Sequence, residues 1–275
     1  MPLSKFKFSV LVLVFVSVYQ SAFAFDIAPF RDLIPVAKED FIYANYFTIQ
    51  QDLNTPEVNL LNFQKFEKPL PLPAAPYNRR EQFGTWINPK DDGLCMNVRH
   101  IVLVRDADAN VTYSPDGCSV QAGAWNDPYT AKTFETPQEI QIDHFVPLKN
   151  AYMTGAHEWS ADKRCLYSNY MGNDFHLLAV SARENLSKSD GTPNRYTPPN
   201  KNYVCQYLKQ WLAVKAIWNL RLTPPEASAV ENHVVANNCD VKQFKLTASE
   251  LASERLYMES NKDLCSRIEP PKTQN

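Results

Sequence analysis

The sequence predicts an α+β fold in which short strands alternate with amphipathic helices. Segments 98–104, 118–123 and 140–146 carry apolar residues at alternate positions, which is the pattern of half-buried strands. Between Tyr203 and Trp218 the apolar residues instead recur at helical spacing, which predicts a long helix. Apolar residues make up 44% of the 275 residues, enough to form a buried core. We therefore expect a globular protein of mixed secondary structure.

Residues 1–24 have the features of a signal peptide. Two lysines precede an apolar run from Phe8 to Tyr19, and Ala22-Phe23-Ala24 provides the small-x-small pattern of a cleavage site. The run is shorter than the roughly 20 residues that a membrane-spanning helix needs. We therefore expect an exported protein, secreted or periplasmic, that begins at Phe25 and has no membrane contact after cleavage.

Three regions are expected after the signal peptide. Residues 25–80 form an N-terminal extension of unknown role, punctuated near its end by prolines that interrupt helices and central strands. Residues 81–235 form the main domain, and residues 236–275 form a helical tail tied down by a disulfide.

Six cysteines follow the signal peptide, and an even number in an exported chain indicates three disulfides. No C-x-x-C pair occurs, which argues against a metal cluster. The expected pairs are Cys95 with Cys118 across a hairpin, Cys239 with Cys265 at the tail, and Cys165 with Cys205 as the remaining two.

The charge balance limits how the protein meets nucleic acid. Removing the two lysines of the signal peptide leaves 26 of the 28 basic residues against 30 acidic ones, a net charge of about −4. A protein held on nucleic acid by bulk electrostatics is strongly basic instead. Any nucleic-acid contact should therefore be local and transient, as a degrading enzyme requires.

The first predicted elements of the main domain are extended. A strand at 98–104 is followed by a turn at 106–110 and a returning strand at 118–123, and 125–129 reads as a loop. In the next strand, 140–146, Ile140 and Ile142 point inward. His144 lies on the same side near the strand end, where a buried scaffold meets a cleft.

Helices become more frequent after Pro147. We expect a helix at 148–159, a strand at 175–180 and a short helix at 182–188. The long helix at 203–218 follows, and then two more are expected: one opened by the capping sequence Thr223-Pro224-Pro225-Glu226 and one at 247–258.

Candidate chemistry gathers at the two ends of the segment from 141 to 190. Asp143 directly precedes His144 at the end of an apolar strand, and Asn185 opens a polar helical turn about forty residues later. Carboxylate and amide oxygens suit a hard cation, and a histidine beside them suits a general base. The three side chains converge only if strand 175–180 pairs back on strand 140–146.

A set of motifs follows in order along the chain: Asp143-His144-x-x-Pro147, Gly155-Ala156-x-x-Trp159, Arg164, Asn173-Asp174, Leu177-Leu178-Ala179-Val180, Asn185-x-x-Lys188, Pro198-Pro199, Cys205-x-Tyr207 and Lys215. Together they resemble the secreted HNH endonuclease family related to the C-terminal domain of GmrSD-type restriction enzymes. The resemblance covers roughly 95 to 230.

The resemblance implies a ββα-metal (HNH) nuclease core with covering helices and disulfides. It also implies that His144 is the general base that activates water, while Asp143 and Asn185 bind one divalent ion, Mg²⁺ first, with Mn²⁺ or Zn²⁺ as alternatives. A hard, oxygen-bound cation neutralises charge on the scissile phosphate and its leaving oxygen, which fits these ligands.

Two basic residues are candidates for phosphate contact. Lys188, also a candidate catalytic group, would neutralise a phosphate, or it is an ordinary solvated helical lysine. Arg164 would bind the substrate backbone through its two-pronged guanidinium, or it pairs with a nearby carboxylate.

The chain departs from the family at His176, which stands where HNH enzymes have an asparagine that orients the catalytic histidine. Three interpretations stay open. His176 donates a hydrogen bond to the backbone near His144, it joins the metal shell and admits zinc or nickel, or Asn173 takes over the orienting role.

The expected function is that of an exported, metal-dependent endonuclease acting on DNA, and on RNA as an alternative. Low sequence specificity is expected because the chain has no recognition module. No nucleophile elbow, dinucleotide turn or P-loop occurs among its seven glycines. The alternatives are a catalytically inactive, disulfide-stabilised exported binding protein on the same scaffold, and a nuclease toxin or effector.

Overall fold

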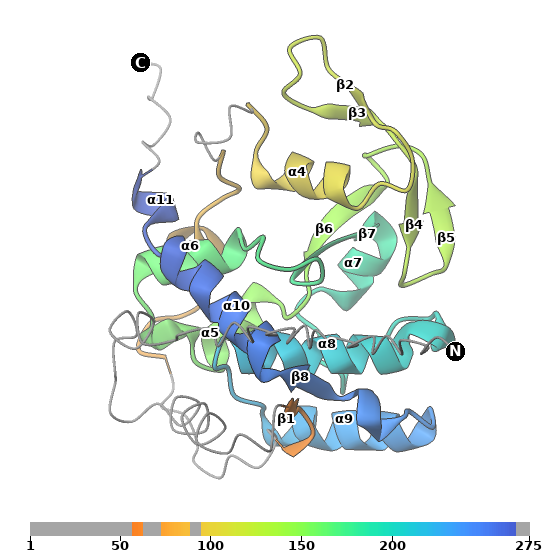
Figure 1. Ribbon diagram of the computed structural model, residues 1–275, viewed down its shortest axis with the longest axis vertical. Helices are drawn as coiled ribbons and strands as arrows, with labels where there is room; N and C mark the ends of the chain where they lie inside the picture. Colours follow the sequence, from red (N-terminus) through yellow and green to blue (C-terminus); the bar gives the residue numbers. More distant parts are fainter. Residues whose placement is uncertain (1–56, 63–72, 89–94, 268–275) are drawn as a thin grey trace, which may run out of the picture. The chain divides into compact units, whose positions relative to one another are not determined.

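The computed structural model describes residues 57–62, 73–88 and 95–267 (Figure 1). The expected signal peptide, the expected start at Phe25 and most of the N-terminal extension lie outside these residues. Among the helices that are described, none has both the length and the apolar character needed to cross a membrane. The described part is a mixed α+β fold with small two-stranded sheets and three disulfides.

Two antiparallel strands and a helix form the centre of the fold. β6 (Ile140–His144) pairs with β7 (Leu177–Ser181), so that Ile140 lies opposite Ser181 and His144 opposite Leu177. α7 (Ala182–Lys188) begins directly after β7, because the Ser181 side chain accepts a hydrogen bond from the main-chain N–H of Glu184. The two predicted strands and the helix at 182–188 are confirmed, and the strands pair as the convergence of Asp143, His144 and Asn185 would require.

Helices cover this centre on one side. α8 (Val204–Ile217) lies beside α9 (Pro224–Ala236), and α10 (Ala248–Ser260) also contacts α8 (Figure 1). Both α9 and α10 open with a capping box, in which a threonine and a glutamate three residues later satisfy each other's main-chain N–H groups. These three helices confirm the sequence prediction.

The expected helix at 148–159 is interrupted. α5 (Leu148–Met153) ends at Thr154, and a 3-10 turn, η3 (Ala156–Glu158), follows. Between them Gly155 has a φ of 147°, which a side chain at this position would disfavour. The glycine therefore stops the helix that the apolar spacing predicted.

The expected strand at 98–104 is wrong, because this segment forms α4 (Val98–Arg105). Asn97 caps it through the main-chain N–H of His100, and Val98 and Val102, four residues apart, are both buried. α4 contacts β6 and β7 (Figure 1). A short segment with few apolar residues fits a strand and a short helix equally well, and the cap decides for the helix.

Short hairpins follow α4. The expected strand at 118–123 exists as β3 (Val120–Ala122), but its partner is β2 (Thr112–Tyr113). The expected loop at 125–129 begins as a strand, β4 (Trp125–Asp127), which pairs with β5 (Lys132–Phe134). Trp125 is buried and donates its indole N–H to the carbonyl of Leu103 in α4, which fastens this hairpin to the helix.

Segments from the two ends of the described chain are joined through β1 with β8 and through contacts with α6. β1 (Glu57–Asn59) pairs with β8 (Lys245–Thr247). α3 (Arg79–Phe83) contacts α6 (Ala161–Ser168), which also contacts the last helix, α11 (Leu264–Arg267). Two 3-10 turns complete the elements: η4 (Lys201–Tyr203) and η5 (Val241–Gln243).

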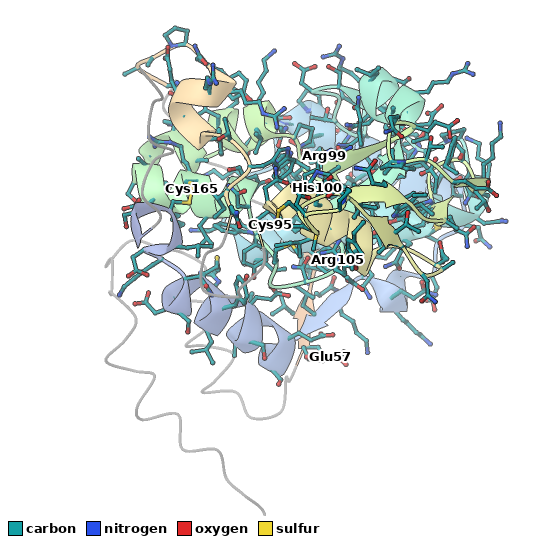
Figure 2. The ribbon with its side chains drawn as sticks, turned by 90° about the horizontal axis from the view of Figure 1, so that it is seen from above. Glu57, Cys95, Arg99, His100, Arg105 and Cys165 are labelled. Atoms are coloured by element: carbon teal, nitrogen blue, oxygen red, sulfur yellow. A yellow bond between two sulfur atoms is a disulfide. The ribbon has the colours of Figure 1, made fainter. Side chains whose placement is uncertain are left out.

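One of the three expected disulfides is confirmed and two are wrong. Cys95 pairs with Cys118, but it joins the segment before α4 to the β2–β3 hairpin instead of bridging the two strands of a hairpin. The other two bonds are Cys165–Cys265 and Cys205–Cys239. Cys95 and Cys165, one partner each of two of the three bonds, are labelled in Figure 2. Cys265 therefore ties the tail to α6, while Cys239 ties the end of α9 to α8.

The core has two parts, one on each face of the β6–β7 pair. Ile140, Ile142, Leu177 and Ala179 face a cluster with α4 and Trp125. A larger cluster is centred on α8 and includes Phe145 and Val146, which follow β6 directly. The end of β6 thus lies where the two clusters meet.

Candidate active site

His144 ends β6, and its ring is fixed by two neighbours. Its Nε2 lies 2.9 Å from the main-chain oxygen of Ser168, the last residue of α6, and the Trp86 ring stacks on the imidazole at 5.1 Å and 10°. A carbonyl oxygen only accepts, so Nε2 carries the hydrogen and Nδ1 holds the lone pair. The last carbonyls of a helix lack partners within the helix, which explains why one is available here.

The environment keeps this imidazole neutral. The side chain is 7% exposed, and burial together with the positive charge of Arg79 holds the pKa of His144 well below its ordinary value. The hydrogen bond to Ser168 opposes this shift only in part. At neutral pH the ring is therefore a neutral base with its lone pair on Nδ1.

A small recess adjoins His144. It is formed by His144, Leu148 and Ser168 on one side and by Arg79 with the segment from Gly84 to Trp86 on the other. Its volume is about 10 Å³, close to the space that a single water molecule requires. A base beside a water-sized recess can activate that water as a nucleophile.

The polar end of α6 positions both walls of the recess. Ser168 donates its hydroxyl to the carbonyl of Phe83, and Asn169 donates to the carbonyl of Thr85 while accepting from the main-chain N–H of Ile87. The same turn of chain also supplies the carbonyl that holds His144. The segment 82–87 is therefore fixed relative to the imidazole.

Asp143 is buried on a different side of β6. Its Oδ1 lies 2.8 Å from the Lys188 ammonium, and its Oδ2 accepts a 2.6 Å hydrogen bond from the hydroxyl of Tyr129. Burial raises the pKa of Asp143 and lowers that of Lys188, and the attraction between the two opposes both shifts. With a second donor on the carboxylate, we take the pair as ionised.

Lys188 therefore lies inside the fold. It is 1% exposed and donates to Asp143 and, at 3.1 Å, to the main-chain oxygen of His144. This ammonium links the end of α7 to the end of β6 and reinforces the position of His144.

The proposed metal ligands already take part in hydrogen bonds within the fold. Asn185 donates its amide N–H to Gln141 at 2.9 Å, and each Asp143 oxygen accepts from one donor, Lys188 or Tyr129. Within 57–62, 73–88 and 95–267, no three or more His, Cys, Asp or Glu side chains gather as a metal site. An ion bound by Asp143 would compete with the Lys188 ammonium for this carboxylate.

His176 lies in an aromatic cage formed by Tyr167, Tyr170 and Trp218. Its Nε2 lies 2.8 Å from the carbonyl oxygen of Tyr167, and burial lowers the pKa of His176 to about 3. Its own carbonyl accepts from the N–H of Phe145. Of the three interpretations, the arrangement agrees with the hydrogen bond to the backbone near His144, because Tyr167 directly precedes Ser168.

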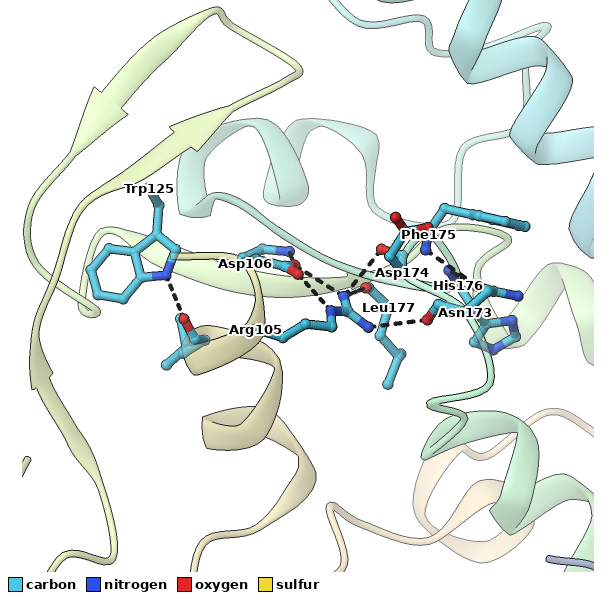
Figure 3. A network of polar contacts seen from close by, with 10 residues as sticks. Arg105, Asp106, Trp125, Asn173, Asp174, Phe175, His176 and Leu177 are labelled. Carbon is cyan, nitrogen blue, oxygen red and sulfur yellow. Dashed lines mark hydrogen bonds and ion pairs between the residues drawn. The ribbon is translucent and has the colours of Figure 1, made fainter. Parts of the chain in front are cut away.

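The loop before β7 is held by a polar network that includes Asn173 (Figure 3). The Asn173 side chain accepts from the N–H groups of Phe175 and His176, while Arg105 donates to the carbonyls of Asn173 and Leu177. Asn173 thus orients the backbone of His176. The carbonyl of His176 in turn accepts from the N–H of Phe145, the residue after His144.

Arg164 lies apart from Asp143 and Asn185. Its guanidinium, partly buried, donates to the main-chain oxygens of Gln82 and Trp159. Through Gln82 it holds the segment that leads to the recess residues Gly84 to Trp86. The partners of Arg164 are therefore two main-chain carbonyls, whereas the sequence suggested a carboxylate or a phosphate.

Four contributors to the site were missed by sequence reasoning: Trp86, Arg79, Tyr129 and the Ser168 carbonyl. Trp86 and Arg79 precede the motif region, and a carbonyl has no side-chain signature. Tyr129 lies in the predicted loop and had no distinguishing neighbour.

Comparisons with known proteins match this part of the chain. Residues 105–227 match the family model described as "GmrSD restriction endonucleases, C-terminal domain". An "Uncharacterized secreted protein" of Arthroderma benhamiae is 36% identical over 161 residues, which cover 58% of this chain and 74% of the relative. No solved structure matches. The chain belongs to the family of the GmrSD restriction endonuclease C-terminal domain.

Proposed function

We propose that this protein is an exported nuclease that hydrolyses phosphodiester bonds in DNA, and in RNA as an alternative, with little sequence preference. One observation carries the proposal: His144 is a neutral imidazole, held through Nε2, beside a recess of water size. The family match and the secreted relative support the nuclease class and the export. In this proposal β6, β7 and α7 form the ββα-metal core.

The reaction begins with a water molecule in the recess. His144 accepts a proton from it at Nδ1, and the resulting hydroxide attacks the phosphorus. The bond between phosphorus and the leaving sugar oxygen on the opposite side then breaks, that oxygen takes a proton from solvent, and the imidazolium releases its proton to solvent. The Ser168 carbonyl and the Trp86 ring keep the imidazole in one orientation throughout.

The divalent ion, Mg²⁺ or its alternatives Mn²⁺ and Zn²⁺, is a separate part of the proposal. No step above is routed through it, because Asp143 is already paired with Lys188. If the ion binds there, chelation abolishes cleavage and metal addition frees the Lys188 ammonium from its partner.

The proposal is tested by cleavage of plasmid DNA and of RNA by the oxidised mature protein, with Mg²⁺ and with a chelator. We expect His144→Ala to lower the rate by about 100-fold to 10,000-fold, the range typical of a lost general base. His233→Ala is the matched control, because His233 also binds a main-chain carbonyl through Nε2, that of Pro193.

The alternative is a catalytically inactive exported binding protein on the same scaffold. The pairing of both Asp143 oxygens favours this alternative. Folded wild-type protein that cuts neither DNA nor RNA with Mg²⁺, Mn²⁺ or Zn²⁺ would establish it, and cleavage retained in His144→Ala would contradict the role of His144.

A further inference from the structure

We propose that Arg79 binds the scissile phosphate, so that the segment from Arg79 to Ile87, which precedes the family match, completes the active site. The inference rests on the proposed nuclease function and names a residue that this function leaves unassigned. Arg79 and His144 line the same recess, and the segment that carries Trp86 closes it.

Arg79 lines the recess and could bind an anionic ligand there. Its side chain is exposed, and within the described part of the chain its guanidinium has no hydrogen-bond or ion-pair partner. Its charge acts on His144, since it helps to lower the pKa of that imidazole. The guanidinium is thus close to the base and open on its outer side.

Three other basic side chains near the site are engaged by groups of the fold. Lys188 pairs with Asp143, and Arg164 donates to two main-chain carbonyls. Arg105 pairs with Asp106 and holds the loop before β7. None of these three presents its charge to the recess, whereas Arg79 lines it.

A phosphodiester is the ligand that this arrangement suits. A guanidinium offers two parallel N–H groups that match two phosphate oxygens, and it stays charged at any relevant pH. Fixing the phosphate beside the recess places the phosphorus next to the water that His144 activates. The same contact neutralises the charge that grows on the phosphate oxygens as the hydroxide attacks.

The segment is built to hold this position. Asn78 caps α3 by accepting from the N–H groups of Arg80 and Glu81, and Gly84 ends the helix at a φ of 71° and ψ of −148°. That conformation is nearly restricted to glycine. The turn at Gly84 leads the chain from α3 to Trp86, which covers His144.

Cleavage kinetics provide the first test, with the full oxidised chain. We expect Arg79→Ala to lower kcat/KM for an oligonucleotide by about 100-fold, as for the loss of one charge-stabilising donor, and Arg79→Lys to recover part of it. Arg80→Ala is the matched control: it is the next residue of the same helix, is exposed and does not line the recess. It should stay within about 2-fold of wild type.

Phosphate binding provides a second test that needs no activity. Calorimetric titration with inorganic phosphate should show binding to wild type and to His144→Ala, and at least a 10-fold weaker affinity in Arg79→Ala. Equal affinity in Arg79→Ala and Arg80→Ala would overturn the inference.

The two proposals fail in different ways. If wild type cleaves, His144→Ala does not, and Arg79→Ala matches wild type in rate and in phosphate affinity, the Arg79 inference falls and the nuclease stands. If wild type never cleaves but binds phosphate through Arg79, the nuclease falls and the phosphate site stands.

Discussion

His144 and His176 share one structural device. Their Nε2 atoms bind two consecutive carbonyls, Ser168 and Tyr167, at the end of α6. Both rings are buried, and burial lowers the pKa of each. A helix end thereby gains the partners that its last carbonyls lack, and two imidazoles gain a fixed tautomer.

The neutral state of His176 makes stability depend on pH. Its pKa is about 3 in the folded protein and about 6.5 in the unfolded chain, so below pH 6.5 only the unfolded chain takes up the proton. The contribution of His176 is complete above pH 6.5 and is lost as the pH falls toward 3.

We expect His176→Phe to remove up to about 1.4 kcal/mol per pH unit from the slope of unfolding free energy between pH 6 and pH 4. Urea unfolding at several pH values measures this slope. His144 still contributes to it in the variant, so the slope should decrease without vanishing. Parallel curves for the two proteins would show that folded His176 is protonated in this range.

Sequence reasoning singled out His144, the proposed base, but not the groups that hold its ring. Asp143-His144 stood out because an acidic residue and a histidine ended an apolar strand. The Ser168 carbonyl was invisible because every residue has one. Lys188 was expected either to contact a phosphate or to be solvated, and its pairing with Asp143 depends on tertiary contacts between α7 and β6.

At the scale of elements, α5, α8 and α9 are joined by a buried polar network. Lys215 of α8 lies 3.0 Å from Glu226 of α9 and donates to Asn150 and Thr154 at the end of α5. Trp211 donates its indole N–H to the same glutamate. α5 follows the Asp143–Pro147 segment directly, so this network fixes the helix that continues from the site.

Removing the buried charge of Lys215 should lower the free energy of unfolding. We expect Lys215→Met to lower the unfolding free energy by about 3–5 kcal/mol, because Glu226 would remain buried without its counter-charge. The matched control is Lys245→Met, whose ion pair with Glu57 is exposed and should contribute within about 1 kcal/mol. Urea denaturation of both variants measures the difference, and similar losses would contradict the prediction.

The sequence predicted elements best where two local signals agreed. Thr223 with Glu226 marked the start of a helix whose following residues also fit a helix, and α9 is present. In the segment 98–104 the prediction rested on the spacing of apolar residues alone and did not consider Asn97 as a cap. The β4–β5 hairpin was missed because three-residue strands are too short to show alternation.

At the scale of the whole molecule, long-range pairings could not be inferred. Pairing cysteines with near neighbours along the chain gave Cys95–Cys118 correctly and the other two bonds wrongly. The pairing of β1 with β8 joins segments almost two hundred residues apart, and neither strand carries a signal for the other. Such contacts are decided by packing of the complete chain.

The three disulfides should differ in their contribution to stability. Loop-closure entropy gives about 3.4 kcal/mol for Cys95–Cys118, about 3.8 kcal/mol for Cys205–Cys239 and about 4.7 kcal/mol for Cys165–Cys265, whose separations are 23, 34 and 100 residues. Replacing each pair by alanine should therefore lower Tm most for Cys165–Cys265. The opposite order in thermal unfolding would show that native-state contacts outweigh chain entropy.

The Cys205–Cys239 bond is nested inside the loop that Cys165–Cys265 closes. On the proposed export route the chain arrives from its N-terminal end, so Cys165 meets Cys205 before Cys239 or Cys265 has emerged. An oxidase that joins cysteines in order of arrival would follow the native Cys95–Cys118 bond with a non-native Cys165–Cys205 bond, which thiol–disulfide exchange would have to undo. We therefore expect oxidative folding of the reduced chain to be faster when a disulfide isomerase is present.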